Sequence, residues 1–435
     1  MSVVPDPRLD IFERPSMCAS IIQQNNVKIK PLNALTNHLS PIQFEIPSIP
    51  DCYIDPSNCF LKVSVQVLNA DLTAITPPAA ATATVAAVPA AIISPSCNFM
   101  HSLFSEVEVY ANNVLISNNS NLYAYKSFFM NLFGFGESSK STELITEGWL
   151  EDKPGERALD TGESLLERAK WIKFSKTFYM YGRIKSELFQ IRKFIPSGID
   201  ITIRLVQNKP SCVLYANAGQ PVCKILDATF NCCYAKLDNE VLAAQEETVS
   251  KSNFLLPHIR TQMKVFNIPS GYFNKEVVLH SGKLGGRVTI GFVENSTLAG
   301  DYSKDMFNFK NFGIDELYLT VNSVKIPTSG LKFDFTSGDF NEGYLATYQA
   351  LKTYARNKSN GLTKEAYKNG SFITQFDITK DLSFAEGPFG ANEVGTVSLY
   401  VSFNAALSAP VSVIVMFEHE SVLGITKHRE IILDA

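Results

Sequence analysis

Two segments of the chain share one pattern: EVEVYANNVLI at residues 106–116 and ELYLTVNSVKI at residues 316–326. In the first, apolar Val107, Val109 and Ala111 alternate with the side chains between them, which is the period of a strand that buries one face. Asparagine follows each alternating run, and asparagine favours the tight turn of a β-hairpin. Each segment therefore predicts a hairpin, and the second hairpin lies 210 positions after the first.

The same order of elements follows each hairpin. A helical stretch comes next, NLYAYKSFFMNLF at 121–133 in the first half and FNEGYLATYQALKTYA at 340–355 in the second. Three strand-like segments then complete each half: KFSKTFYMYGRI, IDITIRLV and CKILDATFNCCYAKL in the first, and SFITQFDI, TVSLYVSF and PVSVIVMFEHE in the second. This recurrence predicts an all-β chain of two tandem antiparallel jelly-roll sandwiches (a double jelly roll) with short helices in the loops.

The alternation also predicts which side chains face the two cores. The residues expected to point inward are Leu61, Val63, Val65, Val67, Ile199, Ile201, Ile203, Leu205, Leu226, Ala228, Phe230, Cys232, Val397, Leu399, Val401 and Phe403. Sandwiches bury the inner faces of their two sheets against each other.

Changes in composition predict the limits of the domains. Residues 1–40 contain several prolines and no sustained period, so they predict an N-terminal arm that becomes ordered on assembly. Residues 41–240 are the expected first jelly roll and residues 263–435 the second. Between them, residues 241–262 turn charged and locally helical, as expected of a linker.

The charge of the chain argues against general binding of nucleic acid. The formal net charge is −4, whereas a sequence-independent grip on duplex DNA requires a dense basic patch. Charged residues make up 19% of the chain, below the usual value of about 25%. Together with 30 phenylalanines and 16 tyrosines, this low charge predicts wide protein–protein contacts.

Cysteine usage and hydropathy address the compartment and the membrane. The eight cysteines form no C-x-x-C pair, so we expect buried reduced thiols in a protein that folds inside a cell. Residues 72–100 carry no charge, but they are rich in alanine and threonine and contain four prolines. We therefore expect no membrane span, and we interpret the Ala/Thr/Pro-rich residues 70–95 as a surface loop.

No constellation typical of an enzyme is found. Only His419, between Glu418 and Glu420, suggests a metal ligand, and a strand end exposed to solvent is the favoured interpretation. The glycine-rich residues 281–287, SGKLGGR, lack the spacing of a phosphate-binding loop and predict a turn between strands. We assign no catalytic, cofactor-binding or metal-binding residue, and we expect no cofactor and no enzyme activity.

Two other groups of residues have competing interpretations. The paired carboxylates Glu246 with Glu247, and Glu106 with Glu108, are expected to be exposed and to lack a pocket. A row of four phenylalanines could stack nucleic-acid bases, but packing of a helix onto the edge of a sandwich or onto a neighbouring subunit is favoured. These phenylalanines are Phe128, Phe129, Phe133 and Phe135.

The chain closely resembles the major capsid proteins of Maverick/Polinton elements, also called adintoviruses, which belong to the double jelly-roll family. The resemblance runs nearly end to end and rests on an ordered series of segments: RLDIF at 8–12, SPIQFEIP at 40–47, YIDPSNCFLKV at 53–63, HSLFSEVEVYANNVLI at 101–116, SKTFYMYGRIKSELF at 175–189, IDITIRLV at 199–206, DYSKDMFNFKNF at 301–312 and FDITKDL at 376–382. The chain departs from the family in the loop at 70–95, which is longer and more apolar than expected.

The resemblance implies a viral structural protein. It implies a homotrimer whose six jelly rolls form a hexon-like, pseudo-hexameric capsomer, and an icosahedral capsid in which these capsomers enclose double-stranded DNA. The implied partners are neighbouring capsomers, a separate single jelly-roll penton protein at the vertices, and minor or cement capsid proteins. The implied location is the virion, assembled inside the host cell. Deletion of residues 2–36 is then expected to leave trimers intact and to weaken closure of the shell.

Other functions remain open at this point. A host-domesticated copy of such an element would keep the fold and do non-viral work. A carbohydrate-binding sandwich module and a metal-dependent jelly-roll enzyme are two further alternatives. The tandem repeat argues against the last two, because neither needs two similar halves after a long N-terminal arm.

Overall fold

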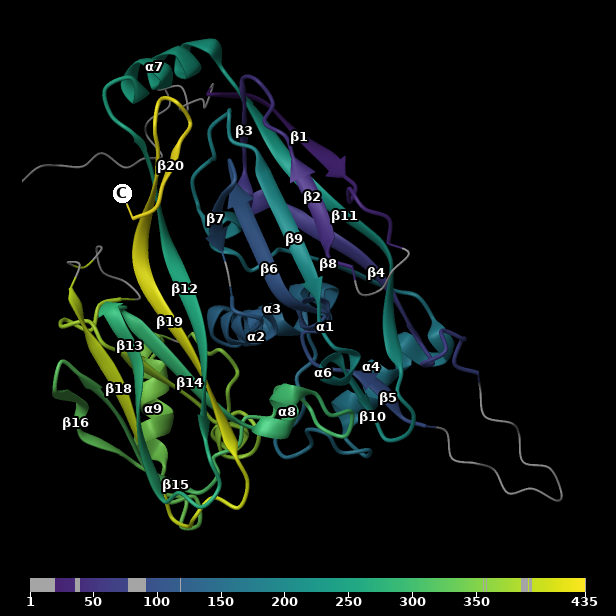
Figure 1. Cartoon of the computed structure of the whole chain (residues 1–435), viewed down its shortest axis with the longest axis vertical. Coiled ribbons are helices and arrows are strands. Elements are labelled where there is room, and N and C mark those ends of the chain that lie inside the picture. The colour runs from purple at the N-terminus through teal and green to yellow at the C-terminus, as the bar shows by residue number, and fades with distance from the viewer. Residues whose placement is uncertain are drawn as a thin grey trace, which may run out of the picture.

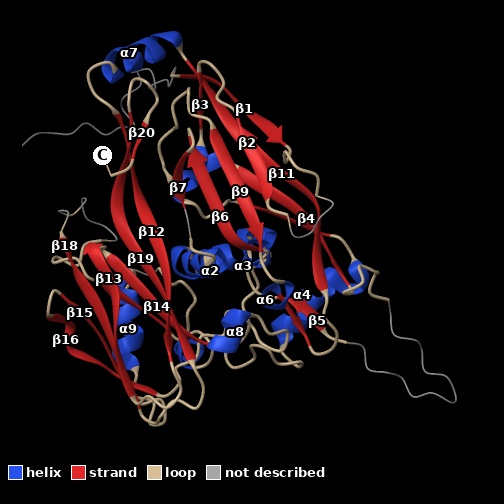
Figure 2. Ribbon diagram, in the orientation of Figure 1, coloured by secondary structure: helices blue, strands red, loops and turns tan. Residues whose placement is uncertain are grey.

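The computed structural model of the chain describes residues 20–35, 40–76, 91–117, 119–354, 356, 358–384, 390 and 393–434. In this part of the chain, strands assemble into two antiparallel sandwiches of two sheets each (Figures 1 and 2). The strands of the first half are β1 (Ile21–Ile29), β2 (Ile42–Ile46), β3 (Cys52–Ile54), β4 (Phe60–Leu68), β5 (Ile93–Pro95), β6 (Phe104–Ala111), β7 (Val114–Ser117), β8 (Phe178–Gly182), β9 (Ile201–Gln207), β10 (Leu214–Ala216) and β11 (Val222–Leu237).

The second half contains a similar set of strands. They are β12 (Phe254–Ile268), β13 (Asn274–Lys283), β14 (Arg287–Glu294), β15 (Ile314–Val321), β16 (Val324–Lys332), β17 (Ile373–Asp377), β18 (Val394–Phe403), β19 (Val411–Ile425) and β20 (Ile431–Ile432). β13 ends at Lys283 and β14 begins at Arg287, so residues 284–286 of the glycine-rich SGKLGGR segment form the predicted turn between strands.

The sheet order is the same in both sandwiches. The first pairs β1-β11-β4-β8 with β2-β9-β6-β7, and the second pairs β12-β19-β14-β17 with β13-β18-β15-β16. If the eight strands on these paths are numbered along each half, both sandwiches have the order 1-8-3-6 in one sheet and 2-7-4-5 in the other. Two nested Greek keys with eight strands define a jelly roll, so the fold is a double jelly roll, as the repeat predicted.

The two hairpins that reveal the repeat have matching turns. β6 and β7 are joined by Asn112 (φ 44°) and Asn113 (φ 66°), and β15 and β16 by Asn322 (φ 46°) and Ser323 (φ 69°). Positive φ at both central residues gives a turn whose twist matches that of the flanking strands. The predicted hairpins are therefore confirmed down to the turn.

Helices occupy the loops. They are α1 (Phe99–Ser102), α2 (Tyr123–Gly134), α3 (Glu137–Ser141), α4 (Glu163–Ile172), α5 (Glu187–Gln190), α6 (Pro210–Val213), α7 (Asn239–Val249), α8 (Asn295–Ala299), α9 (Asn341–Ala350) and α10 (Lys364–Lys368), with the 3-10 turns η2 (Pro56–Asn58), η3 (Glu143–Glu147) and η4 (Lys173–Ser175). α2 and α9 follow the hairpins at equivalent places, which confirms the predicted helical stretch at 121–133 and residues 341–350 of the stretch predicted at 340–355. Residues 351–354 are not helical, and residue 355 lies outside the described residues.

Each half contributes to the core of the other. Phe128 and Phe129 of α2 pack against Phe307 and Phe309 of the second half, with ring centroids 4.3 Å apart for Phe128–Phe307 and 5.3 Å apart for Phe129–Phe309. In return, three apolar residues of the second half belong to the core of the first sandwich: Leu256, Leu423 and Ile425. Figure 1 shows β12 and β19 rising past the second sandwich beside the first. The two sandwiches are thus interlocked.

The inward-facing residues agree with the alternation except at one position. Leu226 is 41% exposed, although the sequence places it in the core. The pairing of β11 with β4 shifts register between Ile225 and Asp227, so one extra residue is inserted there. Such a bulge moves the next side chain to the other face. The prediction for Leu226 is therefore wrong, and Ile225 is buried instead.

The structure also differs from the sequence at the expected domain limits. Residues 21–29, which fall in the expected arm, form β1 and pair with β11. The expected linker at 241–262 contains most of α7 and the beginning of β12. The remaining arm residues 1–19 and 36–39, and residues 77–90 of the Ala/Thr/Pro-rich loop, lie outside the described residues.

Candidate functional site

A cleft of about 810 Å³ lies between the two sandwiches. In each sandwich, the edge strand of one sheet borders the cleft. β8 contributes Tyr181 and Gly182 to its wall, and β17 contributes Gln375. One part of its wall is apolar and is formed mainly by Phe60, Phe129, Met130, Phe133, Ile259 and Met416. Another part is charged and is formed by Glu143, Glu147, Arg183, Lys185, Arg192 and Glu418.

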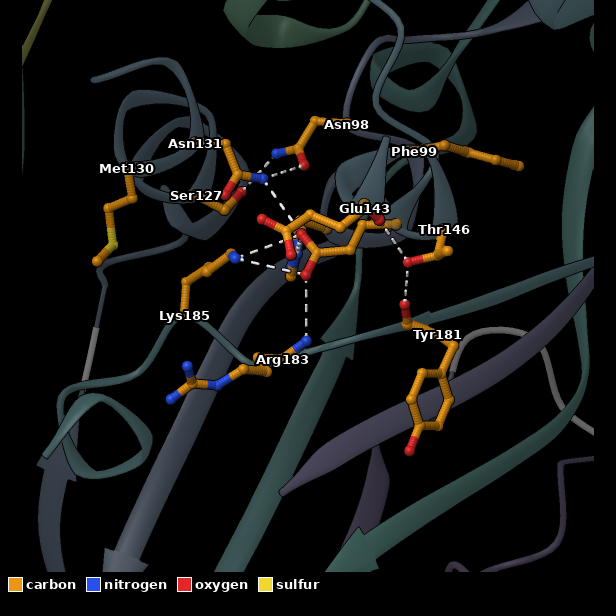
Figure 3. Close-up of polar contacts among 12 residues, drawn as sticks. Asn98, Phe99, Ser127, Met130, Asn131, Glu143, Thr146, Tyr181, Arg183 and Lys185 are labelled. Carbon is orange, nitrogen blue, oxygen red and sulfur yellow. Dashed lines mark hydrogen bonds and ion pairs between the residues drawn. The ribbon is translucent and has the colours of Figure 1, made fainter. Parts of the chain in front are cut away.

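The carboxylate of Glu147 is the centre of a buried polar network beside this cleft. Its Oε2 lies 3.0 Å from Nε2 of His101 and 3.3 Å from Nζ of Lys185, and it accepts a hydrogen bond from Nδ2 of Asn131 at 3.3 Å. Its Oε1 accepts the backbone N–H of Arg183 at 3.2 Å. Figure 3 shows Asn131, Arg183 and Lys185 converging from two separate elements. The carboxylate is thus fully partnered although Glu147 is only 5% exposed.

Two glycines permit this arrangement. Gly148 ends η3 with φ 77°, a left-handed conformation that glycine adopts without strain, and a Cβ there would lie 2.7 Å from Cβ of Phe99. At the end of β8, a Cβ on Gly182 would overlap the side chain of Glu147. η3 can therefore pack against β8 because Gly148 and Gly182 lack side chains.

The electrostatics make this network a structural device. Burial alone would raise the pKa of Glu147, but the neighbouring His101 and Lys185 outweigh burial and lower that pKa to about 2. Burial also lowers the pKa of His101, although the Glu147 carboxylate opposes this shift, and Lys185 is a second cationic partner of Glu147. General acid–base catalysis needs a group that titrates near the working pH. The network is therefore suited to holding α1, α2, η3 and β8 together.

A second buried network joins the long loop after α3 to the second sandwich. Arg157, 6% exposed, lies 3.2 Å from Asp305 and donates to Oγ of Ser371 at 3.2 Å. Asp152, 3.8 Å from Arg157, also accepts from Arg168 at 2.9 Å. Because breaking a buried ion pair leaves an uncompensated charge, these contacts fix the loop in place.

The residues around His419 do not form a metal site. Glu418 is 7% exposed and binds Arg287 through two hydrogen bonds of 2.7 and 2.9 Å, so the expectation of a solvent-exposed strand end is wrong for it. The reason is that β19 continues to Ile425 and passes the edge of β14. Burial, Arg260 and Lys283 lower the pKa of His419 to about 4, and these cations would repel a metal ion. Among the described residues, no three His, Cys, Asp or Glu side chains gather as a metal site.

The paired carboxylates have different surroundings. Glu246 and Glu247 are exposed, as the sequence predicted. Glu106 is 5% exposed, and its carboxylate accepts the backbone N–H groups of Asn119 and Asn121, so its expected exposure is wrong. The pairing of β6 with β9 shifts register beside Glu106, which turns this side chain toward the loop after β7.

The phenylalanine row and the cysteines agree with the favoured interpretations. Phe128, Phe129 and Phe133 are buried, and α2 packs between the sandwiches, which supports packing over base stacking. Of the seven cysteines in the described part of the chain, all are free and only Cys52 is not fully buried. Cys18 lies outside the described residues. The prediction of buried reduced thiols is confirmed for the other six.

Sequence reasoning missed the residues of the Glu147 network and the cleft. His101, Glu147 and Lys185 are far apart in the chain and belong to no recognisable motif. In the sequence, these residues share only one feature, which is that each charged or titratable side chain has apolar neighbours. Many surface residues have the same feature, so it does not identify a site. Within the described ranges, no helix combines the length and apolar content that a membrane span requires.

Comparison with curated proteins gives one distant relative. No model of a known protein family matches the chain. An uncharacterized protein of Caenorhabditis elegans is 24% identical over 269 residues, which cover 60% of this chain and 62% of that protein. The chain thus spans less than two thirds of the length of the curated relative that it matches.

Solved structures share the fold over nearly the whole chain. The Sputnik virophage structure contains a chain that matches with a TM-score of 0.65 at 11% identity, over 100% of this chain and 92% of that chain. The Faustovirus major capsid protein matches with a TM-score of 0.66 at 10% identity, over 96% and 93%. The mavirus major capsid protein matches with a TM-score of 0.58 at 9% identity, over 99% and 93%. These neighbours have the double jelly-roll fold and are structural capsid proteins, not enzymes.

Proposed function

We propose that the chain is a major capsid protein whose copies form trimers, and that these trimers tile an icosahedral shell around double-stranded DNA. The observation that carries the proposal is the equal strand order of the two sandwiches within one interlocked chain. A hexagonal lattice position requires six similar lateral contacts, and three copies of a tandem pair supply six similar domains with only threefold symmetry.

The interlocking of the sandwiches supports this use. Lateral contacts in a shell require a fixed angle between the two domains of each subunit. Phe128 on α2, the reciprocal core residues of β12 and β19, and the Arg157–Asp305 ion pair all oppose a hinge between the halves. A chain built to open and close around a ligand would keep a smaller and more polar contact between its domains.

The surface of the second sandwich supports wide protein contacts. The sheet β13-β18-β15-β16 and the turn before it expose several large apolar residues, which are Phe273 (60%), Val278 (59%), Val324 (63%) and Val394 (79%). These residues are spread along the sheet, since Phe273 precedes β13 and Val394 pairs with Lys283 at its other end, so they fit a wide lateral contact. Neighbouring subunits are the partners that the proposal assigns to this sheet.

The proposal extends to partners, location and origin. We assign the chain to the Maverick/Polinton group, with a separate single jelly-roll penton protein at the vertices, minor or cement proteins between capsomers, and the virion as its location after assembly inside the host cell. The division into a first jelly roll that ends near residue 240 and a second that begins after α7 is part of the same proposal.

Purification of the chain alone tests the proposal. Sedimentation should give a particle of about three times 48.1 kDa, and negative-stain images should show six-sided capsomers or closed shells. A monomer at all concentrations, with no shells after the ionic strength is varied, would reject capsid assembly.

A second candidate is a cellular copy of the same gene that no longer builds particles. The observation in its favour is the relative in Caenorhabditis elegans, an animal protein. Neighbouring genes for a packaging ATPase, a protease and a polymerase would favour the viral function, and their absence with a monomeric product would favour the cellular copy.

A further inference from the structure

The cleft between the sandwiches contains polar groups that have no partner in the described part of the chain. Gln375 is 1% exposed; its Nε2 donates to Oγ1 of Thr289 at 3.0 Å, but its Oε1 accepts nothing. Nε of Arg183 is also buried without an acceptor, and the exposed Arg192 lines the same cleft. A buried polar atom without a partner costs about 1–3 kcal/mol, so an occupant of the cleft that satisfied these groups would be favoured.

Part of the lining of the cleft is apolar and aromatic, and this part adjoins Arg183, because Leu61, the neighbour of Phe60, pairs with Gly182. Phe60 stacks on Tyr181 with ring centroids 5.0 Å apart, and Tyr181 is 39% exposed. Phe129, Met130 and Phe133 of α2 continue this wall. The cleft therefore suits a short segment that combines large apolar side chains with carboxylates.

The chain itself contains such a segment just before the described residues. Residues 9–13 read LDIFE, with three large apolar residues and two acidic ones. The apolar side chains match the aromatic part of the lining, and Asp10 and Glu13 match the positive charges of Arg183 and Arg192. One nitrogen of the Arg183 guanidinium, Nη2, already donates to the carbonyl of Phe189 at 2.7 Å, whereas its Nε has no acceptor in the described part of the chain.

The segment is long enough to reach the cleft. Ile21 pairs with Leu237 and Phe60 pairs with Asn231, so Phe60 at the cleft lies six residues along β11 and two strands across from Ile21, or about 22 Å away. Residue 13 is seven residues before Ser20, and seven extended residues span about 23 Å. The reach is therefore sufficient within one chain.

We propose that residues 9–13 of the chain bind in the cleft between the sandwiches of the same molecule, with Leu9, Ile11 and Phe12 supplying apolar contacts and Asp10 and Glu13 facing Arg183 and Arg192. This binding holds the two sandwiches together from outside the shared core. It does not depend on the capsid function.

The test uses a labelled peptide of residues 2–17, which ends before Cys18, and the protein lacking residues 2–19. Fluorescence anisotropy should show saturable binding with a Kd of about 10 to 100 μM, because tethering adds an effective concentration of about 1 mM in the intact chain. Arg192→Glu should weaken binding about tenfold, and the peptide with Glu13→Lys alone should recover affinity for this variant, because Asp10 still faces the unchanged Arg183. Lys193→Glu is the matched control, since Lys193 is exposed, adjacent and not part of the cleft wall.

Hydrogen exchange on the full chain provides the second measurement. Amides of β8 and β17 should be protected in the intact protein relative to the protein lacking residues 2–19, at every protein concentration. Absence of peptide binding at about 1 mM, or equal loss of affinity in Arg192→Glu and Lys193→Glu, would overturn the proposal. Protection that appears only on oligomerisation would assign the cleft to a second copy and would also overturn it.

Discussion

Glu147 illustrates how single residues keep a charge inside this fold. Burying a carboxylate is costly unless its charge and lone pairs are satisfied. His101, Asn131, Lys185 and the backbone of Arg183 satisfy them here, and they come from three separate regions of the first half. The network therefore depends on close backbone approach, and Gly182 is the residue that allows this approach.

Replacement of Gly182 by alanine tests this dependence. The new Cβ would overlap the anchored Glu147 side chain, so we expect Gly182→Ala to lower the free energy of unfolding by about 1 to 3 kcal/mol in urea denaturation. Gly134→Ala is the control, because no atom lies within 4 Å of a Cβ at that position, and it should change stability by less than about 0.5 kcal/mol. Equal effects of the two substitutions would contradict the role of Gly182.

His419 gives the protein a pH dependence. Burial, with Arg260 and Lys283 close by, lowers its pKa to about 4. Between about pH 6.5 and pH 4, the imidazole is therefore protonated in the unfolded chain and neutral in the folded chain. Stability should therefore be complete above about pH 6.5 and should fall as the pH drops toward 4. His419→Gln should flatten this slope by less than about 1 kcal/mol per pH unit, since the ring is only partly buried. Chemical denaturation at several pH values measures the slope, and an unchanged slope in His419→Gln would contradict this role of His419.

At the scale of elements, α2 belongs to the first half by sequence and to the second core by packing. It follows the β6–β7 hairpin, as α9 follows the β15–β16 hairpin. α9 packs within its own half against β17, whereas Phe128 and Phe129 of α2 cross to the other sandwich. Equivalent elements of the repeat have thus acquired different tasks, and α2 acts as the connector.

Removal of the Phe128 ring should weaken this connection. Phe128 stacks on Phe307 and lies 5.3 Å from the ring of Trp149. We expect Phe128→Ala to cost about 3 to 5 kcal/mol in the free energy of unfolding. Tryptophan emission should also shift to longer wavelength, because Trp149 would gain water contact. The control Phe174→Ala removes a ring that is 45% exposed and should cost less than about 1 kcal/mol. An equal cost at both positions would refute the connector role.

At the scale of the whole molecule, β1 changes the expected behaviour of the N-terminal region. Eight of its residues pair with β11 at the edge of a sheet. Deletion of residues 2–36, which the sequence suggested would spare the trimer, also removes this strand. An exposed edge of β11 would then be available for pairing with other chains.

Two deletions separate the strand from the segment before it. The protein lacking residues 2–30 should lose about 2 to 4 kcal/mol of stability, because the ladder hydrogen bonds of β1 are lost, and it should aggregate on heating. The protein lacking residues 2–19 keeps β1 and should stay folded and soluble. Thermal unfolding with light scattering measures both, and similar stability of the two proteins would show that β1 contributes little.

Local patterns in the sequence determined much of this fold. Period-two alternation located the strands, paired asparagines located the turn at Asn112–Asn113, and their recurrence at Asn322 revealed the tandem design. These patterns are readable because a strand with one buried face must alternate, whatever it packs against. β1 escaped detection because nearly all of its side chains are exposed, so burial left no period in its sequence.

Only the tertiary structure decided what lies between the sandwiches. The bulge at Leu226, the buried carboxylates of Glu106 and Glu147, and the crossing of α2 all depend on partners that are distant in the chain. Burial and charge stabilisation at such sites are set by which surfaces meet in space. The alternation of residues along a strand indicates which face of the strand is buried, but it does not identify the element that covers this face.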